Sequence, residues 1–356
     1  MLTANHSLVV HFDDQIARRN GKMGHGVLRF TANPVVGCID RNHHGANSRD
    51  VLGFGPDCPV VEDVAQALSL GAEVLVLGMA PSGGRLPPHM FEEVDRAVDG
   101  GLSIANGLHE QLSDRYLKLR PGQWIWDIRK EPEGLSIASA QAASLGNRRL
   151  LMVGTDMAIG KMTAGIEIWR EAQRRGLHAE FLATGQIGIL ISGRGIALDA
   201  IRVDYACGAV ERMVMDAADA DLQVIEGQGS ILHPGSTSTL PLLRGSCPTH
   251  MVLCHRAGHD RLEDHDVSVP PLSDLIALYE DMASACGSFS RPKTIGVALN
   301  TSSLNDGDAQ NALQTLSKEI GLPVADPVRF GVTPLVDKLS LIHISAPTRR
   351  YAISDA

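Results

Sequence analysis

The segment GTDMAIGKMT, residues 154–163, contains the residue types that proteins use to bind phosphate groups. It follows an apolar run at residues 150–153 and precedes a helical pattern. Gly154 and Gly160 allow successive backbone N–H groups to turn toward one point, and the start of the next helix adds its positive end there. Lys161 adds a mobile cation. The pattern predicts a pocket for a pyrophosphate or polyphosphate.

This loop departs from the usual phosphate-binding motif in its spacing and in one residue type. The usual motif is G-x-x-x-x-G-K-[ST], whereas five residues separate Gly154 from Gly160 here. The residue after the lysine normally places a hydroxyl on Mg²⁺, but this chain has Met162 there. Thr163 cannot replace it by a side-chain rotation, because successive helical residues point about 100° apart. We therefore expect weak or rearranged Mg²⁺ binding, and a loop that holds its ligand intact.

The longer spacing, GTD followed by GK, resembles the loop of dethiobiotin synthetase and its relatives. In that comparison VIEGQGS, residues 224–230, resembles a segment that brings a carboxylate beside the phosphates, which implies this role for Glu226. A plain strand-end carboxylate is the alternative. Asn300 follows a predicted strand and is a candidate contact for an adenine edge, or else a simple turn residue. Dethiobiotin synthetase relies on a further lysine after its second strand, and no lysine stands between Lys161 and Lys293. That enzyme is therefore a poor functional match.

Charge and composition exclude several classes of protein. The 356 residues carry a formal net charge of −9, which argues against a general nucleic-acid binder or a basic membrane-surface protein. No apolar run approaches the roughly 20 residues that span a bilayer, and no secretion signal is recognisable. The six cysteines include no C-x-x-C pair, so we expect no zinc site and a reducing compartment. These features predict a cytoplasmic protein without nucleic-acid or membrane partners.

Short β-rich apolar runs alternate with amphipathic stretches, which is typical of parallel sheets covered by helices. In the first half we expect strands at Leu8–His11, Val35–Ile39, Val74–Leu77, Leu102–Ala105 and Trp124–Ile128, with helices near 61–70 and 89–100. In the second half we expect strands at Leu150–Val153, Ala179–Ala183, Leu222–Ile225, Met251–Cys254 and Thr294–Leu299, with helices near 160–175, 272–285 and 308–320. The fold class is α/β: a Rossmann-like domain followed by a P-loop NTPase-like parallel-sheet domain.

The expected domain limits are residues 1–135 for the Rossmann-like domain, 136–147 for a linker and 148–338 for the P-loop domain. Residues 339–356 form a tail that breaks the α/β pattern. From about residue 340 the tail resembles the translation of a sequencing adapter, and an ordinary frayed terminus is the alternative. We expect no site residue in this tail.

Longer stretches of the chain resemble one family. The second half contains GTDMAIGKMTAGIEIW, VIEGQGSILHPG and MVLCHRAG, and the first half contains APSGGRLPPHM and IANGLHEQLSD. By these motifs the chain is identified as a member of a two-domain family, long catalogued as of unknown function, with a Rossmann-like N-terminal half and a P-loop C-terminal half. Members are described as D-glutamate N-acetyltransferases that use acetyl-CoA. The resemblance covers residues 8–338, and family loops also read G-K-M-T, which agrees with Met162.

The resemblance implies transfer of an acetyl group from acetyl-CoA to the amine of an acidic amino acid, with D-glutamate the first choice. The implied contacts of the CoA nucleotide are Gly154, Thr155, Asp156, Gly160, Lys161, Met162, Thr163 and Asn300. A base must take a proton from the substrate ammonium. Glu226 is our first choice, and Asp156, His233 and His255 are further candidates; a loop histidine that only forms hydrogen bonds is the alternative.

Recognition of a dicarboxylate requires a clamp, and a bidentate arginine suits one carboxylate. Arg85 and Arg256 are candidates, and a plain surface residue is the favoured alternative for either one alone. Thr184, Gln186 and Gln228 follow predicted strands and are further candidate substrate contacts. Two other functions fit the same loop: an ATP-dependent ligase or kinase acting on a carboxylate, and a non-catalytic nucleotide or CoA sensor. The partners expected are a small acidic substrate and further copies of the chain in a homo-oligomer.

Overall fold

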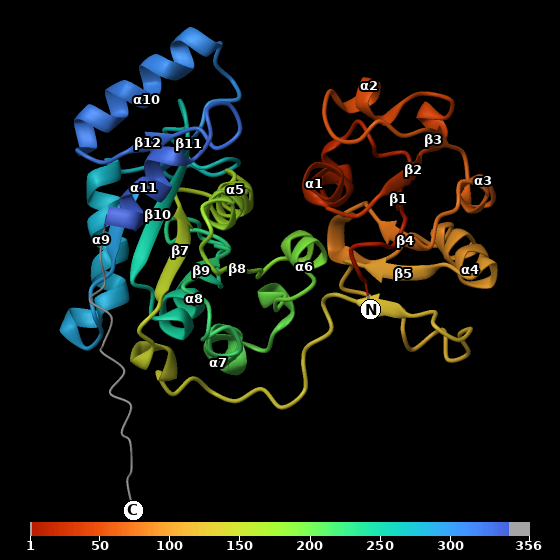
Figure 1. Ribbon diagram of the computed structural model, residues 1–356, viewed down its shortest axis with the longest axis horizontal. Helices are drawn as coiled ribbons and strands as arrows, with labels where there is room; N and C mark the ends of the chain where they lie inside the picture. The colour runs from red at the N-terminus through yellow and green to blue at the C-terminus, as the bar shows by residue number, and fades with distance from the viewer. Residues whose placement is uncertain (1, 342–356) are drawn as a thin grey trace, which may run out of the picture. The chain divides into compact units, whose positions relative to one another are not determined.

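The computed structural model describes residues 2–341 and contains two compact units, each built around a parallel six-stranded sheet (Figure 1). One unit comprises the described part of Met1–Glu133 together with Ala183–Ile201. The other comprises Gly134–Leu182 and the described part of Arg202–Ala356. The two parallel sheets with interspersed helices confirm the predicted α/β class. Within the described range, every helix is too short or too polar to span a bilayer.

The sheet of the first unit has the strand order β3-β2-β1-β4-β5-β6, which is the doubly wound order of dinucleotide-binding folds. Its strands are β1 (Leu8–His11), β2 (Val35–Ile39), β3 (Val60–Val61), β4 (Val74–Leu77), β5 (Ser103–Asn106) and β6 (Ile125–Asp127). Its helices are α1 (Lys22–Phe30), α2 (Ser48–Leu52), α3 (Val64–Ser69), α4 (Met90–Gly100) and α6 (Gln186–Ser192). Short 3₁₀ turns are η1 (Arg19–Gly21), η2 (Arg41–His43), η3 (Ser82–Gly84) and η5 (Leu198–Ala200).

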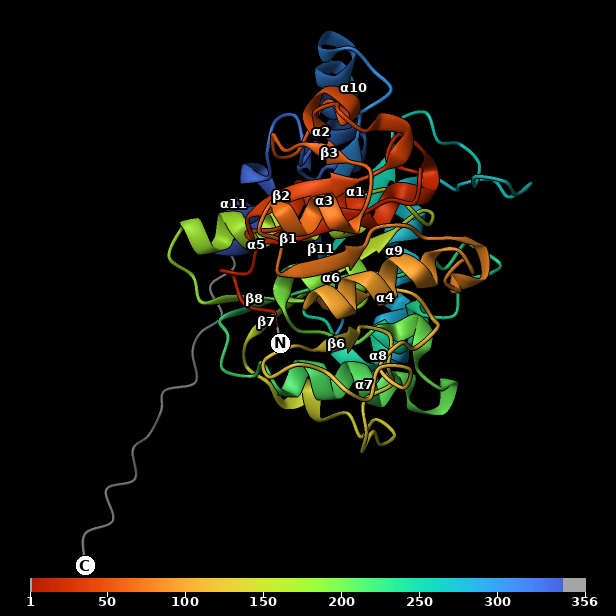
Figure 2. The ribbon, with the colours of Figure 1, turned by 90° about the vertical axis from the view of Figure 1, so that its right-hand side faces the viewer.

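The core of this unit lies on both faces of its sheet. The near-continuous apolar sequences of β1 and β4 are buried along their whole length, as expected for central parallel strands. Helices α3 and α4 pack on one face over a cluster that includes Val9, Leu75, Met90 and Val94, and Figure 2 looks onto this side. Helix α1 contacts β4 and α6. The segment Ala183–Ile201 thus completes a unit from which it is distant in sequence.

The sheet of the second unit has the order β12-β11-β10-β7-β9-β8. Its strands are β7 (Arg148–Gly154), β8 (Ala179–Leu182), β9 (Leu222–Ile225), β10 (His250–Arg256), β11 (Lys293–Asn300) and β12 (Val324–Ala325). Its helices are α5 (Lys161–Arg174), α7 (Val203–Met215), α8 (Thr239–Ser246), α9 (Leu272–Ser284), α10 (Asp306–Ile320) and α11 (Thr333–Leu341). The 3₁₀ turns are η4 (Gln141–Ser144) and η6 (Ala285–Gly287).

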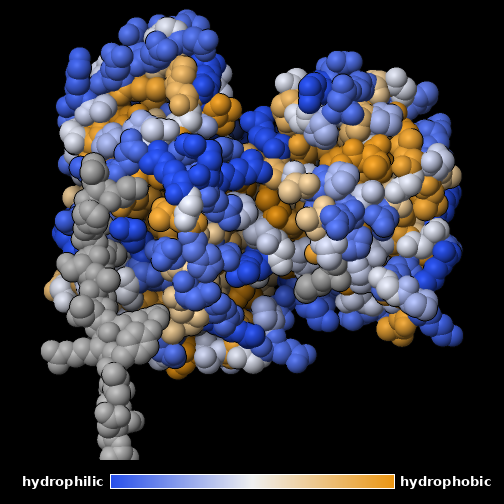
Figure 3. Space-filling model, in the orientation of Figure 1, coloured by the Kyte–Doolittle hydropathy of each residue, from blue (hydrophilic) through white to orange (hydrophobic). Residues whose placement is uncertain are grey.

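Helices cover both faces of the second sheet. Helices α5 and α11 contact each other and one face, whereas α8 and α9 cover the other, because the crossovers run in opposite directions along the sheet. Helix α10 presents a largely hydrophilic outer surface (Figure 3), and Ala309 is its buried residue. The strand order places β7 between β9 and β10, so the ends of these three strands meet at one place on the carboxyl edge.

The predicted strands agree with the structure, and β1, β2, β4 and β9 match residue for residue. The other predicted strands differ from the observed ones by one or two residues at an end. The short strands β3 and β12, and the helices α1, α2, α6, α7, α8 and α11, were not predicted. Of the predicted tail 339–356, the first residues belong to α11, and residues 342–356 lie outside the described residues.

Candidate functional site

The predicted phosphate loop connects β7 to α5 at the carboxyl edge of the second sheet. Gly160 has a φ of +111°, a left-handed conformation that favours glycine, and it caps α5. The N–H of Ala164 donates the first hydrogen bond of the helix, to the carbonyl of Gly160 at 2.9 Å. The N–H groups of Lys161, Met162 and Thr163 precede that bond and therefore point out of the helix start. This backbone geometry suits an anion.

Lys161 is buried at the base of this loop, where only 6% of the residue is exposed. Its Nζ donates a hydrogen bond to the backbone carbonyl of Asp156 at 2.6 Å. Burial lowers the pKa of Lys161 to about 8, although the charges of Cys254, Asp156 and Glu226 act in the opposite direction. A lysine with this pKa is mostly protonated at neutral pH and loses its charge in mildly alkaline solution.

We expect the affinity for CoA to fall as the pH rises above about 8. Below that pH the ammonium is already present; above it, binding of a phosphate must be accompanied by uptake of a proton, because the phosphate raises the lysine pKa further. The affinity then falls by up to roughly tenfold per pH unit. Calorimetric titrations with CoA between about pH 7 and 9.5 measure this slope. Pantetheine, which lacks phosphate, serves as the control. A pH-independent affinity for CoA would remove Lys161 from the phosphate site.

Asp156 and His259 form a buried hydrogen-bonded pair beside the loop. Asp156 Oδ2 lies 2.8 Å from His259 Nε2 and accepts the N–H of Glu263 at 2.9 Å, while Oδ1 accepts the N–H of Met157 at 2.6 Å. Burial acts to raise the pKa of Asp156, but these three donors outweigh it and lower the pKa overall. The carboxyl therefore stays ionised and takes up a proton poorly. Its geometry suits orientation of His259, which leaves Nδ1 as the basic atom of the ring.

The two histidines named from the sequence have different surroundings. His255 Nδ1 lies 3.0 Å from Thr155 Oγ1, and burial, reinforced by His259, lowers the pKa of His255 to about 4. His255 is therefore uncharged at neutral pH. His233 is buried, and its Nδ1 accepts the N–H of Gly235 at 3.0 Å. In its neutral form the His233 ring carries the proton on Nε2, where it donates rather than accepts.

Glu226 follows β9 and lies close enough to Lys161 for its charge to act on the lysine pKa. The residue is 3% exposed, and Gln228 Nε2 donates to its Oε1 at 3.3 Å. Because β9 is hydrogen-bonded to β7, strand pairing brings Glu226 and Gln228 to the loop. In the described part of the chain, no group of three or more His, Cys, Asp or Glu side chains is arranged to hold a metal ion.

Arg256 and Asn300 lie at the ends of the two strands on the other side of β7. Arg256 Nη2 donates to the carbonyl of Ala158 at 3.2 Å, and its Nη1 lies 3.6 Å from Glu263 Oε2, so this arginine lies at the tip of the loop. Asn300 Oδ1 accepts the N–H of Ser302 at 3.0 Å. This hydrogen bond fits the turn residue that was the alternative to an adenine contact for Asn300.

Three predicted substrate contacts belong to the first unit rather than to the unit that contains the loop: Arg85, Thr184 and Gln186. Arg85 is exposed, Thr184 is buried, and Gln186 begins α6. The segment ATGQIG directly follows β8, but the contact of α6 with α1 assigns it to the first unit. Contact of these three side chains with a substrate stays a prediction.

Two residues near the loop were missed by the sequence analysis. His259 stands in CHRAGHDR, four positions after His255, and its place in the same motif as two named candidates was the available signal. Tyr279 is buried on α9; its hydroxyl donates to the Gly154 carbonyl at 2.8 Å and accepts the N–H of Ile231 at 3.0 Å. It joins the start of the phosphate loop to the segment after β9. Nothing in the sequence marks this tyrosine, because its position fits an ordinary apolar helix face.

Comparison with known proteins places both halves of the chain in one family. Residues 136–336 match the P-loop domain, and residues 41–131 the Rossmann-like domain, of a family described as a domain of unknown function, DUF1611. A D-glutamate N-acetyltransferase of a Pseudoalteromonas species is 33% identical over 282 residues, which cover 78% of this chain and 84% of that protein. A D-glutamate N-acetyltransferase of Tritonibacter scottomollicae is 32% identical over 321 residues, 88% of this chain and 95% of that protein.

A solved structure agrees with this assignment over nearly the whole chain. The crystal structure of a DUF1611 family protein from Anabaena variabilis superposes with a TM-score of 0.90 at 45% identity, covering 95% of this chain and all of that one. The matches confirm the Rossmann-like and P-loop domains that the motifs predicted. The chain therefore belongs to the two-domain DUF1611 family.

Proposed function

We propose that this protein transfers the acetyl group of acetyl-CoA to the amine of D-glutamate. Two relatives that are aligned over most of their length carry the name D-glutamate N-acetyltransferase. The observation that supports the use of CoA is the loop itself, whose free helix start and buried Lys161 suit a phosphate ligand. Met162 stands where nucleotide hydrolases place a Mg²⁺-binding hydroxyl, which agrees with a ligand held without cleavage of its phosphates.

The reaction requires one proton transfer before bond formation. The substrate ammonium loses a proton, and the neutral amine attacks the thioester carbonyl. A C–N bond forms, the attacking nitrogen gives up a second proton, the C–S bond breaks, and the departing thiolate of CoA takes up that proton. The products are N-acetyl-D-glutamate and CoA. No phosphoanhydride bond takes part, so the phosphates of CoA serve only for binding.

The length of CoA constrains where the base must lie. Its pantetheine arm joins the pyrophosphate to the thioester and spans roughly 14 Å when extended, about the length of four residues. Glu226 and the pair of Asp156 and His259 all lie beside Lys161 or the loop. If the pyrophosphate binds at Lys161, these groups meet the thioester only when the arm folds back. We therefore propose a folded arm, with Glu226 as the base and His259 as the competing candidate.

A thiol-release assay tests the proposed reaction. We expect release of CoA from acetyl-CoA on addition of D-glutamate, in the absence of ATP, and an N-acetylated product by mass spectrometry. L-glutamate and both enantiomers of aspartate complete the panel, and acetyl-CoA without an amino acid measures hydrolysis. Absence of thiol release with every acidic amino acid would contradict the proposal.

The same preparation separates the other two functions that the loop permits. Mg²⁺-dependent release of ADP from ATP on addition of amino acids would indicate a ligase or kinase. Tight binding of CoA or a nucleotide, with no turnover across the panel, would indicate a sensor.

A further inference from the structure

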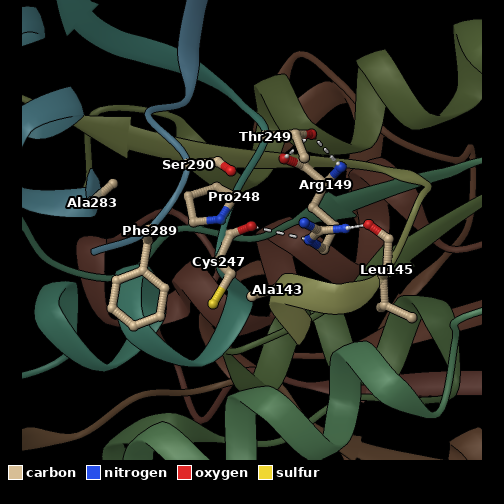
Figure 4. A pocket seen from close by; sticks show the side chains of 9 residues that line it. All are labelled: Ala143, Leu145, Arg149, Cys247, Pro248, Thr249, Ala283, Phe289 and Ser290. Atoms are coloured by element: carbon tan, nitrogen blue, oxygen red, sulfur yellow. Dashed lines mark hydrogen bonds between the residues drawn. The ribbon is translucent and has the colours of Figure 1, made fainter. Parts of the chain in front are cut away.

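A cavity lies at the amino edge of the second sheet, away from the phosphate loop (Figure 4). Arg149 of β7 lines it, together with Cys247, Pro248 and Thr249 before β10 and Phe289 before β11. From Arg149 to Gly154 the strand rises roughly 16 Å. The cavity therefore cannot be part of the phosphate site.

Arg149 is a buried cation without a carboxylate partner. The residue is 3% exposed, and among the described residues no carboxylate forms an ion pair with its guanidinium. Its Nε donates to the carbonyls of Ser246 and Cys247 at 3.1 and 3.0 Å, and its Nη1 donates to the Leu145 carbonyl at 2.9 Å. Carbonyl groups supply only partial charges, so a full positive charge stays uncompensated, which is costly in a protein interior.

One end of the guanidinium is left for a ligand. Nη1 also donates to the backbone and side-chain oxygens of Asn147, whereas Nη2 donates to none of the described residues. Nη2 has no hydrogen-bond partner among them, yet it is not fully enclosed by protein atoms, so it borders open space. Arg149 lines this cavity, and we therefore assign the open space beside Nη2 to it. Two N–H donors of a fixed cation therefore face a ligand-sized volume.

The charges around the cavity favour an anion. Burial lowers the pKa of the adjoining His250 to about 4, and the positive charges of Arg148, Lys293 and Arg149 contribute to this. Burial raises the pKa of the Cys247 thiol, and the negative charge that adds to this effect is that of Glu211. Its carboxylate is engaged, because it accepts hydrogen bonds from the backbone N–H groups of residues 139 and 141 at 2.8 and 2.7 Å.

Apart from Thr249 and Ser290, the remaining residues of the lining are apolar. In Figure 4 the phenyl ring of Phe289 and the guanidinium of Arg149 lie on opposite sides of Cys247, with Pro248 between them. The ring is held by Arg244, whose guanidinium lies 5.5 Å from its centroid. The cavity volume is about 140 Å³. A dry cavity of roughly 150 Å³ holds a molecule as large as benzene.

We propose that this cavity binds a small monocarboxylate with a short apolar tail, of a size between butyrate and benzoate. The carboxylate accepts the Nη2 donors of Arg149, and the tail packs against Phe289 and Pro248. The hydroxyl of Ser290, which also lines the cavity, lies at its exposed rim. Ligand binding there adds stability to the second unit by mass action. The inference is independent of the proposed transferase activity.

Thermal unfolding of the full chain in the presence of carboxylates tests this site. We expect butyrate and benzoate at about 50 mM to raise Tm by roughly 2 °C or more, whereas butyramide, benzamide and sodium chloride at the same concentration do not. The neutral amides match the ligands in shape and lack the charge. Equal shifts with the carboxylates and the amides, or no shift, would overturn the proposal.

Three variants locate the effect. Ser290→Glu places a carboxylate of the chain itself at the cavity and should abolish the response to butyrate and benzoate. Ser288→Glu adds the same charge at an exposed position that does not line the cavity, and it should keep the response. Lys161→Ala should keep it too, because the phosphate loop lies at the opposite edge of the sheet. A full response in Ser290→Glu, or its loss in Lys161→Ala, would contradict the assignment.

Discussion

Replacing Glu226 by glutamine lowers kcat for acetyl transfer to D-glutamate by about 10²–10⁴-fold, the usual contribution of a general base. Glutamine keeps the size of the side chain and can still accept the hydrogen bond from Gln228, but it cannot take up a proton. The KM for acetyl-CoA should stay within about threefold of the wild-type value, because the change removes a transition-state function rather than binding. Steady-state kinetics with both substrates varied measures the two effects separately.

The position of Glu226 beside Lys161 makes the opposite outcome equally informative. A changed KM with an unaltered kcat would place this carboxylate at the phosphates and would refute its role as the base. His259→Gln then becomes the variant expected to lose turnover, since Asp156 orients that ring. Glu319→Gln, an exposed change on α10, is the matched control and should leave both constants unaltered.

Replacing Lys161 by alanine raises the Kd for CoA roughly 10- to 150-fold, because a hydrogen bond to a charged group contributes about 1.5–3 kcal/mol. The effect should be on binding, so kcat at saturating acetyl-CoA should fall less than kcat/KM. Isothermal titration with CoA and with pantetheine measures it: only the affinity for CoA, which has phosphates, should change.

Lys293→Ala supplies the control for this substitution. Lys293 is exposed at the start of β11, at the amino edge of the same sheet, so loss of its charge should leave CoA affinity intact. If Lys161→Ala bound CoA as tightly as the wild type, the phosphate loop would have no part in holding the co-substrate, and the proposed function would lose its structural support.

The longer strands of both sheets and the phosphate loop could be predicted from the sequence, since they depend on local patterns. Buried parallel strands read as short apolar runs, and β1, β2, β4 and β9 were predicted to the residue. The loop could be recognised because Gly160 and Lys161 must stand at the start of a helix to bind an anion. Glu226 could be named as a neighbour of the phosphate loop because it directly follows a predicted strand. The carboxyl ends of parallel strands meet at one edge of a sheet.

Two of the missed helices, α1 and α7, contain glycines that are required by a close neighbour elsewhere in the chain. Glycine disfavours a helix, so the segments of α1 and α7 gave weak helical patterns. A Cβ on Gly24 would lie 2.4 Å from the ring of Phe12, and one on Gly208 would lie 1.7 Å from the carbonyl of Ser136. Tertiary packing therefore demands glycine where the local preference opposes it. His259 was missed for a related reason: its partner, Asp156, is 103 positions away in the sequence.

The interrupted course of the chain through its first unit bears on how the protein is made. Ala183–Ile201 belongs to that unit although β7, α5 and β8 precede it in the sequence. A ribosome must therefore synthesise a large part of the second unit before the first can be completed, so the usual N-terminal-first order of co-translational folding cannot apply in full. Until then, the side of α1 at Gly26, against which Ile187 packs, stays uncovered in the nascent chain.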